Sequence, residues 1–352
     1  MQPSTIVTEP YAWEPSSRQI ALENGLQEEK VIRFDMNTTP YILDTVRQRL
    51  DQCRELRVNE YPAPDYASLR ESVSGYCNTS EEQVVLCAGA DEVIDTIAKT
   101  FLQGGRRSVI SEPTYSMFRV VSQAYGAPIV GVPRTSGFAL DVDALADAAR
   151  DAAVAWVCNP NSPTGNVEPV KKIRELLEKT DCAVVVDEAY AEFCGQSALA
   201  LVDRFDRLIV VRTLSKAFGL AGARVGYAVT NEAVAQRLNA VRLPNSISSL
   251  SSELAQAALS PEGIRQMRAN VARIADERLR MKKALEKKIK AYPSVANFLL
   301  VDVGDAAGKT VKSLQKKGLV VRDLSQKPLT PGCIRITIRS AEENNRLLEA
   351  LG

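Results

Sequence analysis

The sequence predicts an α/β fold in which helices cover both faces of a mainly parallel sheet, accompanied by a smaller domain. Two observations support this. The chain has 352 residues, more than one hydrophobic core usually holds, which favours two domains. Short apolar runs then alternate with amphipathic stretches, as in a parallel sheet that is buried on both faces. These runs are Val84–Cys87, Ser108–Ile110, Ile129–Val132, Ala153–Val157, Ala183–Val186, Leu208–Val211 and Val225–Val229.

These elements divide the chain into three predicted parts. Residues 1–44, with three early prolines and a helix-like stretch at 16–26, are expected to form an arm. Residues 45–247 form the large domain. Residues 248–352 form a small C-terminal domain on which the arm packs. Its predicted elements are two helices within Ser252–Tyr292, broken near Ser260–Pro261, strands at Asn297–Val303, Leu319–Val321 and Ile334–Ile338, and a helix at Glu342–Leu351.

Composition excludes several classes of function. The formal net charge is +1 without a basic, aromatic-rich block, so we expect no nucleic-acid partner. No apolar run can span a bilayer and the first residues do not resemble a signal peptide, so we expect no membrane contact and a cytoplasmic location. Seven cysteines without a CxxC pair favour reduced thiols and no metal site. The absence of histidine leaves Lys, Asp, Glu, Tyr or Cys to carry protons.

One lysine, Lys216, stands just past the apolar run 208–211. Because open α/β sheets bind ligands at the carboxyl ends of their strands, Ser215 and Lys216 are expected to face a ligand there. A lysine at this place can form a Schiff base with a carbonyl cofactor, and three following glycines let the backbone approach a bound group. The alternative is a surface lysine in a glycine-rich turn.

The strand at 183–186 ends in an acidic pair followed by an aromatic residue. Asp187 precedes Lys216 by about one αβ unit, which can place the two on neighbouring strand ends. Pyridoxal phosphate needs a carboxylate opposite its ring nitrogen, since the protonated ring stabilises a carbanion. Asp187 suits that part, and Tyr190 can donate to the ring oxygen. The alternative is that Asp187 merely caps the next helix.

Three further segments add potential ligand groups. The turn at 88–92 joins a strand to a helix and forms an anion site, although Asp91 and Glu92 would repel a phosphate unless their side chains turn away. The loop at 159–165 contains two prolines and a glycine and is expected to form a rigid pocket wall. Tyr115 follows another strand end and can stack on a planar ring.

In this order and spacing, these segments resemble the fold type I, class I/II aminotransferases that use pyridoxal phosphate, and among them most closely the histidinol-phosphate aminotransferases. The resemblance covers nearly the whole chain. It implies a mainly parallel seven-stranded sheet sandwiched by helices, with a smaller α+β C-terminal domain. The segments are NEYPAPDYASLRESV at 59–73, CAGADE at 87–92, EPTYSMF at 112–118, NPNSPTG at 159–165, VVVDEAYAEF at 184–193, RTLSKAFGLAGARVGY at 212–227, ANF at 296–298 and CIRITI at 333–338.

The resemblance also implies residue roles. Lys216 is then the Schiff-base lysine, Asp187 the partner of the pyridine nitrogen and Tyr190 the partner of the ring hydroxyl. The phosphate and ring contacts implied are Ala90, Asp91, Ser215, Arg224 and Tyr115, with Tyr61 supplied by the neighbouring subunit of a homodimer. The substrate contacts implied are Arg335, which clamps a carboxylate or phosphate, with Arg322 and Tyr11.

Some segments depart from the family pattern. Ser162 replaces an asparagine that binds the ring oxygen in many relatives, so either Asn161 or Ser162 is left to take that contact. The segment at 37–40, Asn-Thr-Thr-Pro, replaces Asn-Glu-Asn-Pro, and Ile-Arg-Ser at 338–340 replaces Val-Gly-Thr. These departures leave the substrate more open than the cofactor.

The function expected from the resemblance is ping-pong transamination between small-molecule amino donors and keto acceptors, with histidinol phosphate and 2-oxoglutarate as the pair and histidine biosynthesis as the pathway. The alternatives are another enzyme of the same fold: an aromatic or other amino-acid aminotransferase, a phosphothreonine-type decarboxylase or an amino-acid oxidase. A non-catalytic ligand sensor and a cofactor-free interaction protein complete the alternatives.

Overall fold

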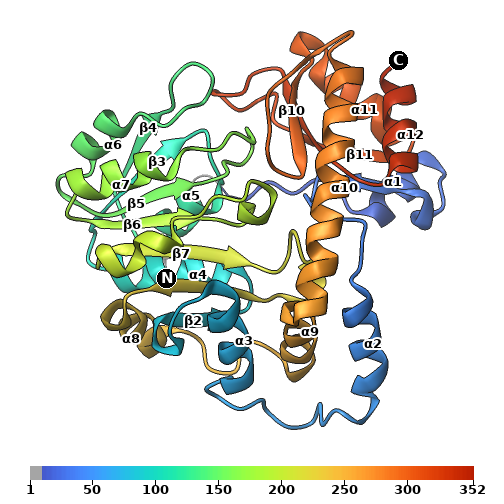
Figure 1. Ribbon diagram of the computed structural model, residues 1–352. Coiled ribbons are helices and arrows are strands. Elements are labelled where there is room, and N and C mark those ends of the chain that lie inside the picture. Colours follow the sequence, from blue (N-terminus) through green and yellow to red (C-terminus); the bar gives the residue numbers. More distant parts are fainter. Residues whose placement is uncertain (1–9) are drawn as a thin grey trace, which may run out of the picture.

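The computed structural model describes residues 10–352 (Figure 1). Its large sheet has seven strands in the order β2-β8-β7-β6-β5-β3-β4. Neighbouring strands are parallel except where β8 pairs with β2 and β7. The predicted, mainly parallel seven-stranded sheet is therefore confirmed. The strands are β2 (Val84–Cys87), β3 (Arg107–Glu112), β4 (Ile129–Pro133), β5 (Ala152–Cys158), β6 (Ala183–Asp187), β7 (Leu208–Thr213) and β8 (Gly226–Thr230).

Helices cover both faces of this sheet because alternate side chains of each strand point to opposite sides. In β6, Val184 and Val186 join one apolar cluster, whereas Val185 joins the other. The first cluster includes residues of α3 (Ala67–Cys77), α6 (Val142–Ala148) and α7 (Val170–Lys179), and the second those of α4 (Ala90–Phe101), α5 (Met117–Ala124) and α8 (Glu232–Val241). With both faces covered largely by apolar side chains, the strand ends are the main place where polar groups can meet a ligand.

A smaller sheet of five strands lies beside the first, in the order β1-β11-β12-β10-β9. Its pairs are antiparallel apart from β1 with β11. Strand β1 belongs to the predicted arm and was not predicted as a strand, so the arm contributes to the small sheet. The division of the chain at residues 44 and 247 stays a prediction. The elements here are α1 (Ser17–Asn24), β1 (Ile32–Phe34), β9 (Lys290–Ala291), β10 (Phe298–Asp302), α11 (Ala307–Lys316), β11 (Leu319–Asp323), β12 (Cys333–Thr337) and α12 (Ala341–Leu351).

Two helices connect the sheets, α9 (Ser249–Leu259) and α10 (Pro261–Leu285). The break lies where the sequence predicts it: the Ser260 hydroxyl caps α10 by accepting from the Gly263 N–H at 3.1 Å. The helix ends at Leu285, before the predicted limit at Tyr292, because β9 follows it. In Figure 1, α10 runs beside both parts of the molecule, and α2 (Asp44–Gln52) lies near α9.

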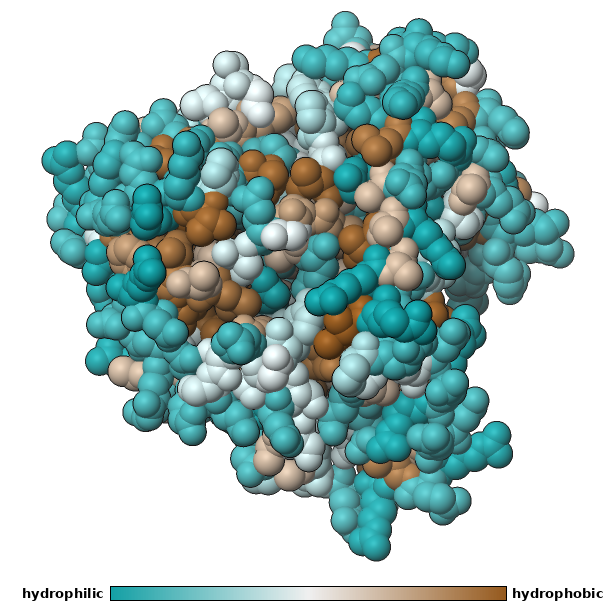
Figure 2. Space-filling view, in the orientation of Figure 1, coloured by the Kyte–Doolittle hydropathy of each residue, from teal (hydrophilic) through white to brown (hydrophobic). Residues whose placement is uncertain are grey.

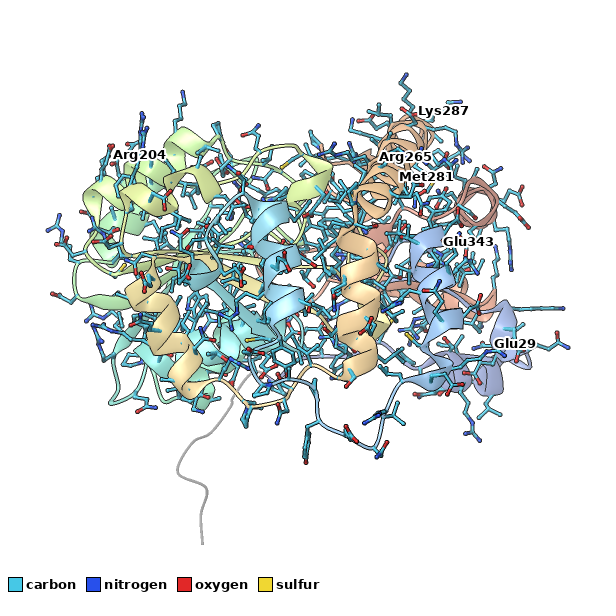
Figure 3. The ribbon with its side chains drawn as sticks, turned by 60° about the horizontal axis from the view of Figure 1, so that its bottom comes forward. Glu29, Arg204, Arg265, Met281, Lys287 and Glu343 are labelled. Atoms are coloured by element: carbon cyan, nitrogen blue, oxygen red, sulfur yellow. The ribbon has the colours of Figure 1, made fainter. Side chains whose placement is uncertain are left out.

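The side chains in Figure 3 show the extent of the two parts. Arg204, just before β7, lies at one side of this view, whereas Glu29 and Glu343 lie at the other side, with the small sheet. Met281 of α10 is buried and belongs to the first apolar cluster, which includes residues of both parts. One continuous core therefore joins the small sheet to one face of the large sheet.

The seven cysteines are all free thiols. Within residues 10–352, no helix has the length and apolar composition needed to cross a membrane. The same residues include no group of three or more His, Cys, Asp or Glu side chains that could hold a metal ion.

The turn before α4 packs directly against the start of β8. Gly89 at this turn has a left-handed backbone, with φ of 87°. A Cβ atom on Gly226 would overlap the backbone of Gly89 and Ala90, so only glycine fits at this end of β8. The close approach fixes the position of the α4 N-terminus relative to β7 and β8.

The variant Gly226→Ala should therefore unfold at a lower urea concentration than the wild type. Overpacking of backbone against backbone costs about 1–3 kcal/mol. Gly222→Ala is the matched control, because a Cβ atom there meets nothing within 4 Å. Equal urea midpoints for Gly226→Ala and Gly222→Ala would contradict the packing argument.

Candidate active site

The polar groups predicted at the strand ends meet in one place. Asp187 ends β6, Lys216 follows β7, and these two strands are neighbours in the sheet. Both side chains line a small pocket, which we call the inner pocket. Its lining is Ala90, Asp91, Tyr115, Cys158, Ser162, Asp187, Ala189, Tyr190, Thr213, Ser215, Lys216 and Arg224.

A larger cavity of about 540 Å³, the outer cavity, adjoins the inner pocket. It shares Tyr115, Ser162, Tyr190 and Lys216 with the inner pocket, and it extends between the arm and the small sheet. A planar group in the inner pocket would thus lie between Asp187 and a second compartment large enough for a substrate.

Asp187 is almost wholly buried. Its Oδ1 accepts a hydrogen bond from the Ala189 N–H at 3.0 Å. Burial raises the pKa of Asp187 to about 7, against the opposing effects of that hydrogen bond and of the Lys216 charge. A carboxyl group in this state is stabilised in its charged form by any further cation, such as a protonated ring nitrogen.

The Lys216 ammonium has few partners. Its Nζ donates to the Met36 carbonyl at 3.3 Å and lies 5.9 Å from the centre of the Tyr190 ring. Burial, followed by the positive charge of Arg335, lowers the pKa of Lys216 to about 8. A substantial fraction of this amine is therefore neutral near pH 8 and able to act as a nucleophile or base.

Tyr190 is buried beside these two groups. Its hydroxyl oxygen accepts a hydrogen bond from Asn37 Nδ2 at 2.8 Å. Burial raises the pKa of Tyr190 to about 12, although the charge of Arg335 opposes this. The phenol is protonated at neutral pH and keeps a proton to donate.

The start of α4 forms a cradle for an anion. The Arg224 guanidinium lies 3.4 Å from the Asp91 carboxylate, which also accepts from the Tyr115 hydroxyl at 2.8 Å. Glu92 is turned back to accept from the Ala88 N–H. Glu92 is thus turned away from the inner pocket, whereas Asp91 still lines it and has its charge offset by Arg224. The helix N-terminus and Arg224 can then bind a phosphate.

Ser215 adds a hydroxyl to this cradle. Its Oγ lies 2.9 Å from Thr213 Oγ1, and its N–H donates to the same Thr213 oxygen at 3.1 Å. These bonds hold the short segment between β7 and Lys216 in place, with Ser215 lining the inner pocket. Ser215 is thus fixed beside the lysine and the α4 N-terminus.

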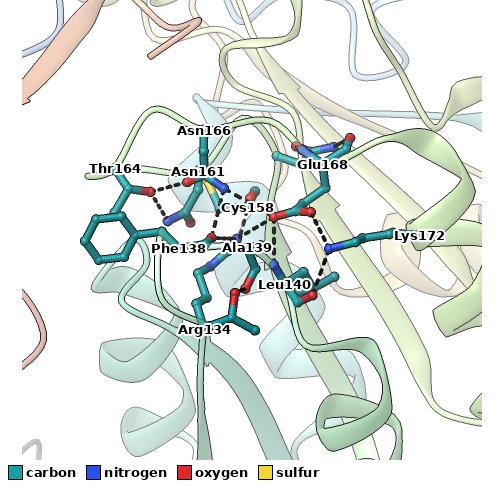
Figure 4. A network of polar contacts seen from close by, with 12 residues as sticks. Arg134, Phe138, Ala139, Leu140, Cys158, Asn161, Thr164, Asn166, Glu168 and Lys172 are labelled. Carbon is teal, nitrogen blue, oxygen red and sulfur yellow. Dashed lines mark hydrogen bonds and ion pairs between the residues drawn. The ribbon is translucent and has the colours of Figure 1, made fainter. Parts of the chain in front are cut away.

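A polar network supports the loop after β5 (Figure 4). Arg134 reaches the Glu168 carboxylate at 3.5 Å, and Lys172 pairs with the same carboxylate at 3.0 Å. Asn161 belongs to this network: its Nδ2 donates to Thr164 Oγ1 at 2.7 Å. Fully buried, Asn161 contributes to neither compartment, whereas Ser162 lines both. The geometry favours Ser162 over Asn161 as a ligand contact.

Arg335 lines the outer cavity next to Ser162, a residue that lines both compartments. Its guanidinium donates to Ser162 Oγ at 3.1 Å and to the Asp35 carbonyl at 2.6 Å. Its Nε is buried and has no hydrogen-bond partner among the described residues. Burial lowers the pKa of Arg335 from its ordinary value. A buried cation with an unused donor is suited to bind an anionic ligand.

Arg322 and Tyr11 line the outer cavity beside Arg335. The Arg322 guanidinium lies 5.2 Å from the centre of the Tyr11 ring and 3.6 Å from the Glu14 carboxylate. Burial raises the pKa of Glu14, so within the Glu14–Arg322 pair the carboxylate is the group that is more easily neutralised, by taking up a proton. The structure therefore brings all three predicted substrate contacts into one cavity.

Tyr61, like Asn161, is a predicted site residue that lies outside both compartments. Its side chain is 85% exposed and it lines neither compartment. Sequence reasoning also missed residues that are present. Met36 and Asn37 contact Lys216 and Tyr190, and Cys158 lines the inner pocket. The altered Asn-Thr-Thr-Pro segment at 37–40 was the available signal for Asn37, whereas Met36 lies just before it.

Comparison with known proteins decides the family. Residues 29–351 match the family described as aminotransferase class I and II. The chain belongs to this family. It is 36% identical over 325 residues to a histidinol-phosphate aminotransferase of Caldanaerobacter subterraneus, covering 91% of this chain and 92% of the relative. A Salmonella typhi enzyme of the same name is 36% identical over 307 residues, covering 85% of each chain.

Solved structures agree with this assignment. The histidinol-phosphate aminotransferase of Sinorhizobium meliloti, solved in complex with pyridoxal 5'-phosphate, superposes with a TM-score of 0.87 at 25% identity, covering 98% of this chain and 94% of that one. The L-threonine-O-3-phosphate decarboxylase of Porphyromonas gingivalis shares the fold, with a TM-score of 0.79 at 23% identity. This aminotransferase is a transaminase that depends on pyridoxal phosphate.

The residues present fit that cofactor. The helix N-terminus at α4, Ser215 and Arg224 provide donors for a phosphate at one end of the inner pocket. Asp187 provides a buried carboxyl for the ring nitrogen, and Lys216 provides an amine with a lowered pKa for the aldehyde. The donor set therefore matches each polar group of pyridoxal phosphate.

The pKa of Lys216 predicts how fast the cofactor-free aminotransferase takes up pyridoxal phosphate. Only the neutral amine attacks an aldehyde, so the uptake rate should rise with pH around a midpoint of about 8. Arg335→Gln should move this midpoint upward, since it removes a neighbouring positive charge. Arg322→Gln, in the same cavity, is the control and should leave it unchanged. Stopped-flow absorbance measures the rate; a wild-type midpoint near 10.5, the ordinary lysine value, would refute the prediction.

Proposed function

We propose that this aminotransferase interconverts histidinol phosphate and 2-oxoglutarate with imidazole-acetol phosphate and glutamate, as a step of histidine biosynthesis. The observation that carries the proposal is the presence of two arginines, Arg322 and Arg335, in the outer cavity beside Lys216. A substrate with an amine at one end and a phosphate at the other can reach both Lys216 and an arginine. The names of the relatives that match over most of the chain support the same substrate.

Pyridoxal phosphate, when bound, supplies an aldehyde carbon for the amino group and an aromatic ring that stabilises negative charge. The residues of the inner pocket would hold it in place: Asp187 would pair with the ring nitrogen, and Arg224, Ser215 and the start of α4 would hold the phosphate. Tyr115 would pack on the ring. Each of these contacts uses a group that the structure already places in the pocket.

Lys216 carries the proton. Its amine would accept the proton from the substrate Cα in one half-reaction and return it in the other. The lowered pKa makes this transfer possible near neutral pH without any histidine in the chain. Tyr190, which stays protonated at neutral pH, would donate its proton to the ring oxygen.

The two half-reactions need the outer cavity to accept different anions. Arg335 presents a planar guanidinium that can hold the carboxylate of glutamate through two hydrogen bonds. Arg322 stands further along the same cavity, next to Tyr11, where the phosphate of histidinol phosphate can be bound. Separate cations for the two anions explain how one cavity serves both.

The leading alternative is a different reaction on the same cofactor, since an L-threonine-O-3-phosphate decarboxylase shares the fold. An aromatic or other amino-acid aminotransferase and an amino-acid oxidase belong to the same group of alternatives. These alternatives differ from the proposed function in two respects. A different amine would convert the bound cofactor, or the reaction would release carbon dioxide or consume oxygen.

A half-reaction screen separates these functions. Amines are added singly to the cofactor-loaded enzyme, and the absorbance of the cofactor is followed. Histidinol phosphate and glutamate should convert it, whereas phosphothreonine should not, and Lys216→Ala should abolish conversion. Arg322→Gln should lower kcat/KM for histidinol phosphate by about 10- to 100-fold, the size of one lost charged hydrogen bond, and affect glutamate less. Release of carbon dioxide, or no conversion by histidinol phosphate, would reject the proposed substrate.

We also propose that the working unit is a homodimer. Support comes from an exposed apolar patch that consists of Val58, Tyr61 and Leu243, whose exposed fractions are 81%, 85% and 59%. The bond from Arg242 to the Pro64 carbonyl, at 2.9 Å, holds the segments of this patch together. Figure 2 shows further hydrophobic side chains gathered across the middle of one face of the molecule. The cytoplasmic location stays a prediction from the sequence.

The dimer assigns Tyr61 to the site of the other subunit, and mixed dimers test this. Lys216→Ala and Tyr61→Ala should each have low activity as pure proteins. When the two are unfolded together and refolded, mixed dimers should contain one site without either substitution, so activity should return to about a quarter of the wild-type value. The quarter follows because half of the dimers are mixed and each has one intact site. Activity no higher than the average of the two pure variants would reject the shared site.

A further inference from the structure

A short segment of the arm crosses the active site. Residues 35–37, which we call the strap, connect β1 to the segment that leads to α2. Each residue of the strap contacts a different functional side chain. The contacts are Asp35 O with Arg335 Nη2 at 2.6 Å, Met36 O with Lys216 Nζ at 3.3 Å, and Asn37 Nδ2 with Tyr190 Oη at 2.8 Å.

Asn37 is the residue by which the strap is fixed to the small domain. Its N–H donates to Thr337 Oγ1 at 2.9 Å, and its carbonyl accepts from Asn297 Nδ2 at 2.8 Å. The side chain is 1% exposed. Both backbone groups and the side chain are therefore held, so the amide has one position relative to Tyr190.

The amide of Asn37 is oriented with its NH₂ group toward the phenol, where Nδ2 donates to Tyr190 Oη. Asn37 Oδ1 points the other way and lies 3.2 Å from Thr337 Oγ1, whose single proton has its shorter contact with the Phe34 carbonyl at 2.7 Å. Since Tyr190 then receives a hydrogen bond on its oxygen, its own single proton is left for another acceptor.

We propose that Asn37 is a positioning residue: by donating an N–H to Tyr190, it directs the phenol proton into the inner pocket, toward the ring oxygen of pyridoxal phosphate. This inference rests on the cofactor of the proposed function but not on its substrate. The role follows from two facts, the donor at Asn37 and the opening of the Tyr190 side chain onto the inner pocket.

A second hydroxyl lies beside Tyr190. Ser162 Oγ accepts a hydrogen bond from Arg335 Nη1, which leaves its own proton to donate, and Ser162 lines the inner pocket. Tyr190 is therefore one of two hydroxyl donors available to the ring oxygen, and Ser162 is retained in all the variants described next. The charged and titratable groups around the phenol are Lys216, Arg335, Asp187 and Cys158, and all four are retained in the variants described next.

The backbone at Asn37 determines which variants are informative. Its φ of 54° lies in the left-handed region, which asparagine, aspartate and glycine tolerate and alanine does not. Asn37→Gly removes the amide and keeps the backbone. Asn37→Asp keeps the size of the side chain but, when ionised, can only accept the phenol proton and turn it away from the pocket.

The test is a pH titration of the absorbance of the cofactor-loaded, substrate-free enzyme. A hydroxyl that donates to the ring oxygen stabilises the deprotonated form of the bound cofactor, so losing that donor raises the titration midpoint. Asn37→Gly should raise the midpoint by about one pH unit, the size of one hydrogen bond to a charged group. Asn37→Asp should raise it at least as far. Tyr190→Phe should raise it too, and adding Asn37→Gly to Tyr190→Phe should have no further effect.

Asn297→Ala is the matched control, because it loosens the strap without removing the amide that faces Tyr190. It should leave the midpoint unchanged. An unchanged midpoint in Asn37→Gly would overturn the proposal, and so would a shift of equal size in the Tyr190→Phe background or in Asn297→Ala. No substrate is present, so the result is independent of whether histidinol phosphate converts the enzyme.

Discussion

The removal of two opposite charges from water, at the ends of neighbouring parallel strands, is the constraint on which the site depends. β6 delivers Asp187 and β7 leads to Lys216, and burial moves the pKa values of both toward neutrality, to about 7 and about 8. Each group is costly to keep charged alone, and each is stabilised by a partner of opposite sign. A ligand that offers a cation to one and a carbonyl carbon to the other satisfies both.

The rest of the molecule keeps these two strand ends in place. Apolar clusters on both faces of the large sheet fix the strands, and the network around Glu168 fixes the loop that carries Ser162. The arm adds a strand to the small sheet and then crosses the site as the strap. The reactive groups and the phosphate cradle therefore come from the large sheet and its loops, whereas the strap and Arg335 come from the arm and the small sheet.

Local sequence was sufficient to predict those site residues that come shortly after a strand. Asp187, Lys216 and Tyr115 follow apolar runs directly, so their positions could be predicted from periodicity and from the rule that ligands bind at strand ends. The break between α9 and α10 was also predictable from the local sequence, because it lies at Ser260–Pro261. Strand β1 was not predictable in this way, because three residues carry little periodic signal and β1 forms only by pairing with β11, almost 290 positions away. Asn37 was hidden for the same reason, since its partners lie at Tyr190, Asn297 and Thr337.

Arg335 shows how a buried, incompletely hydrogen-bonded side chain can make the binding of an anion more favourable. Folding places its guanidinium among protein atoms, leaves Nε without a partner and spends the other two nitrogens on a serine and a main-chain oxygen. An arriving carboxylate or phosphate offsets a desolvation penalty that already exists, so its capture is more favourable than capture by a hydrated arginine. Selectivity for anions at this position is thus a property of the folded chain before any ligand is encountered.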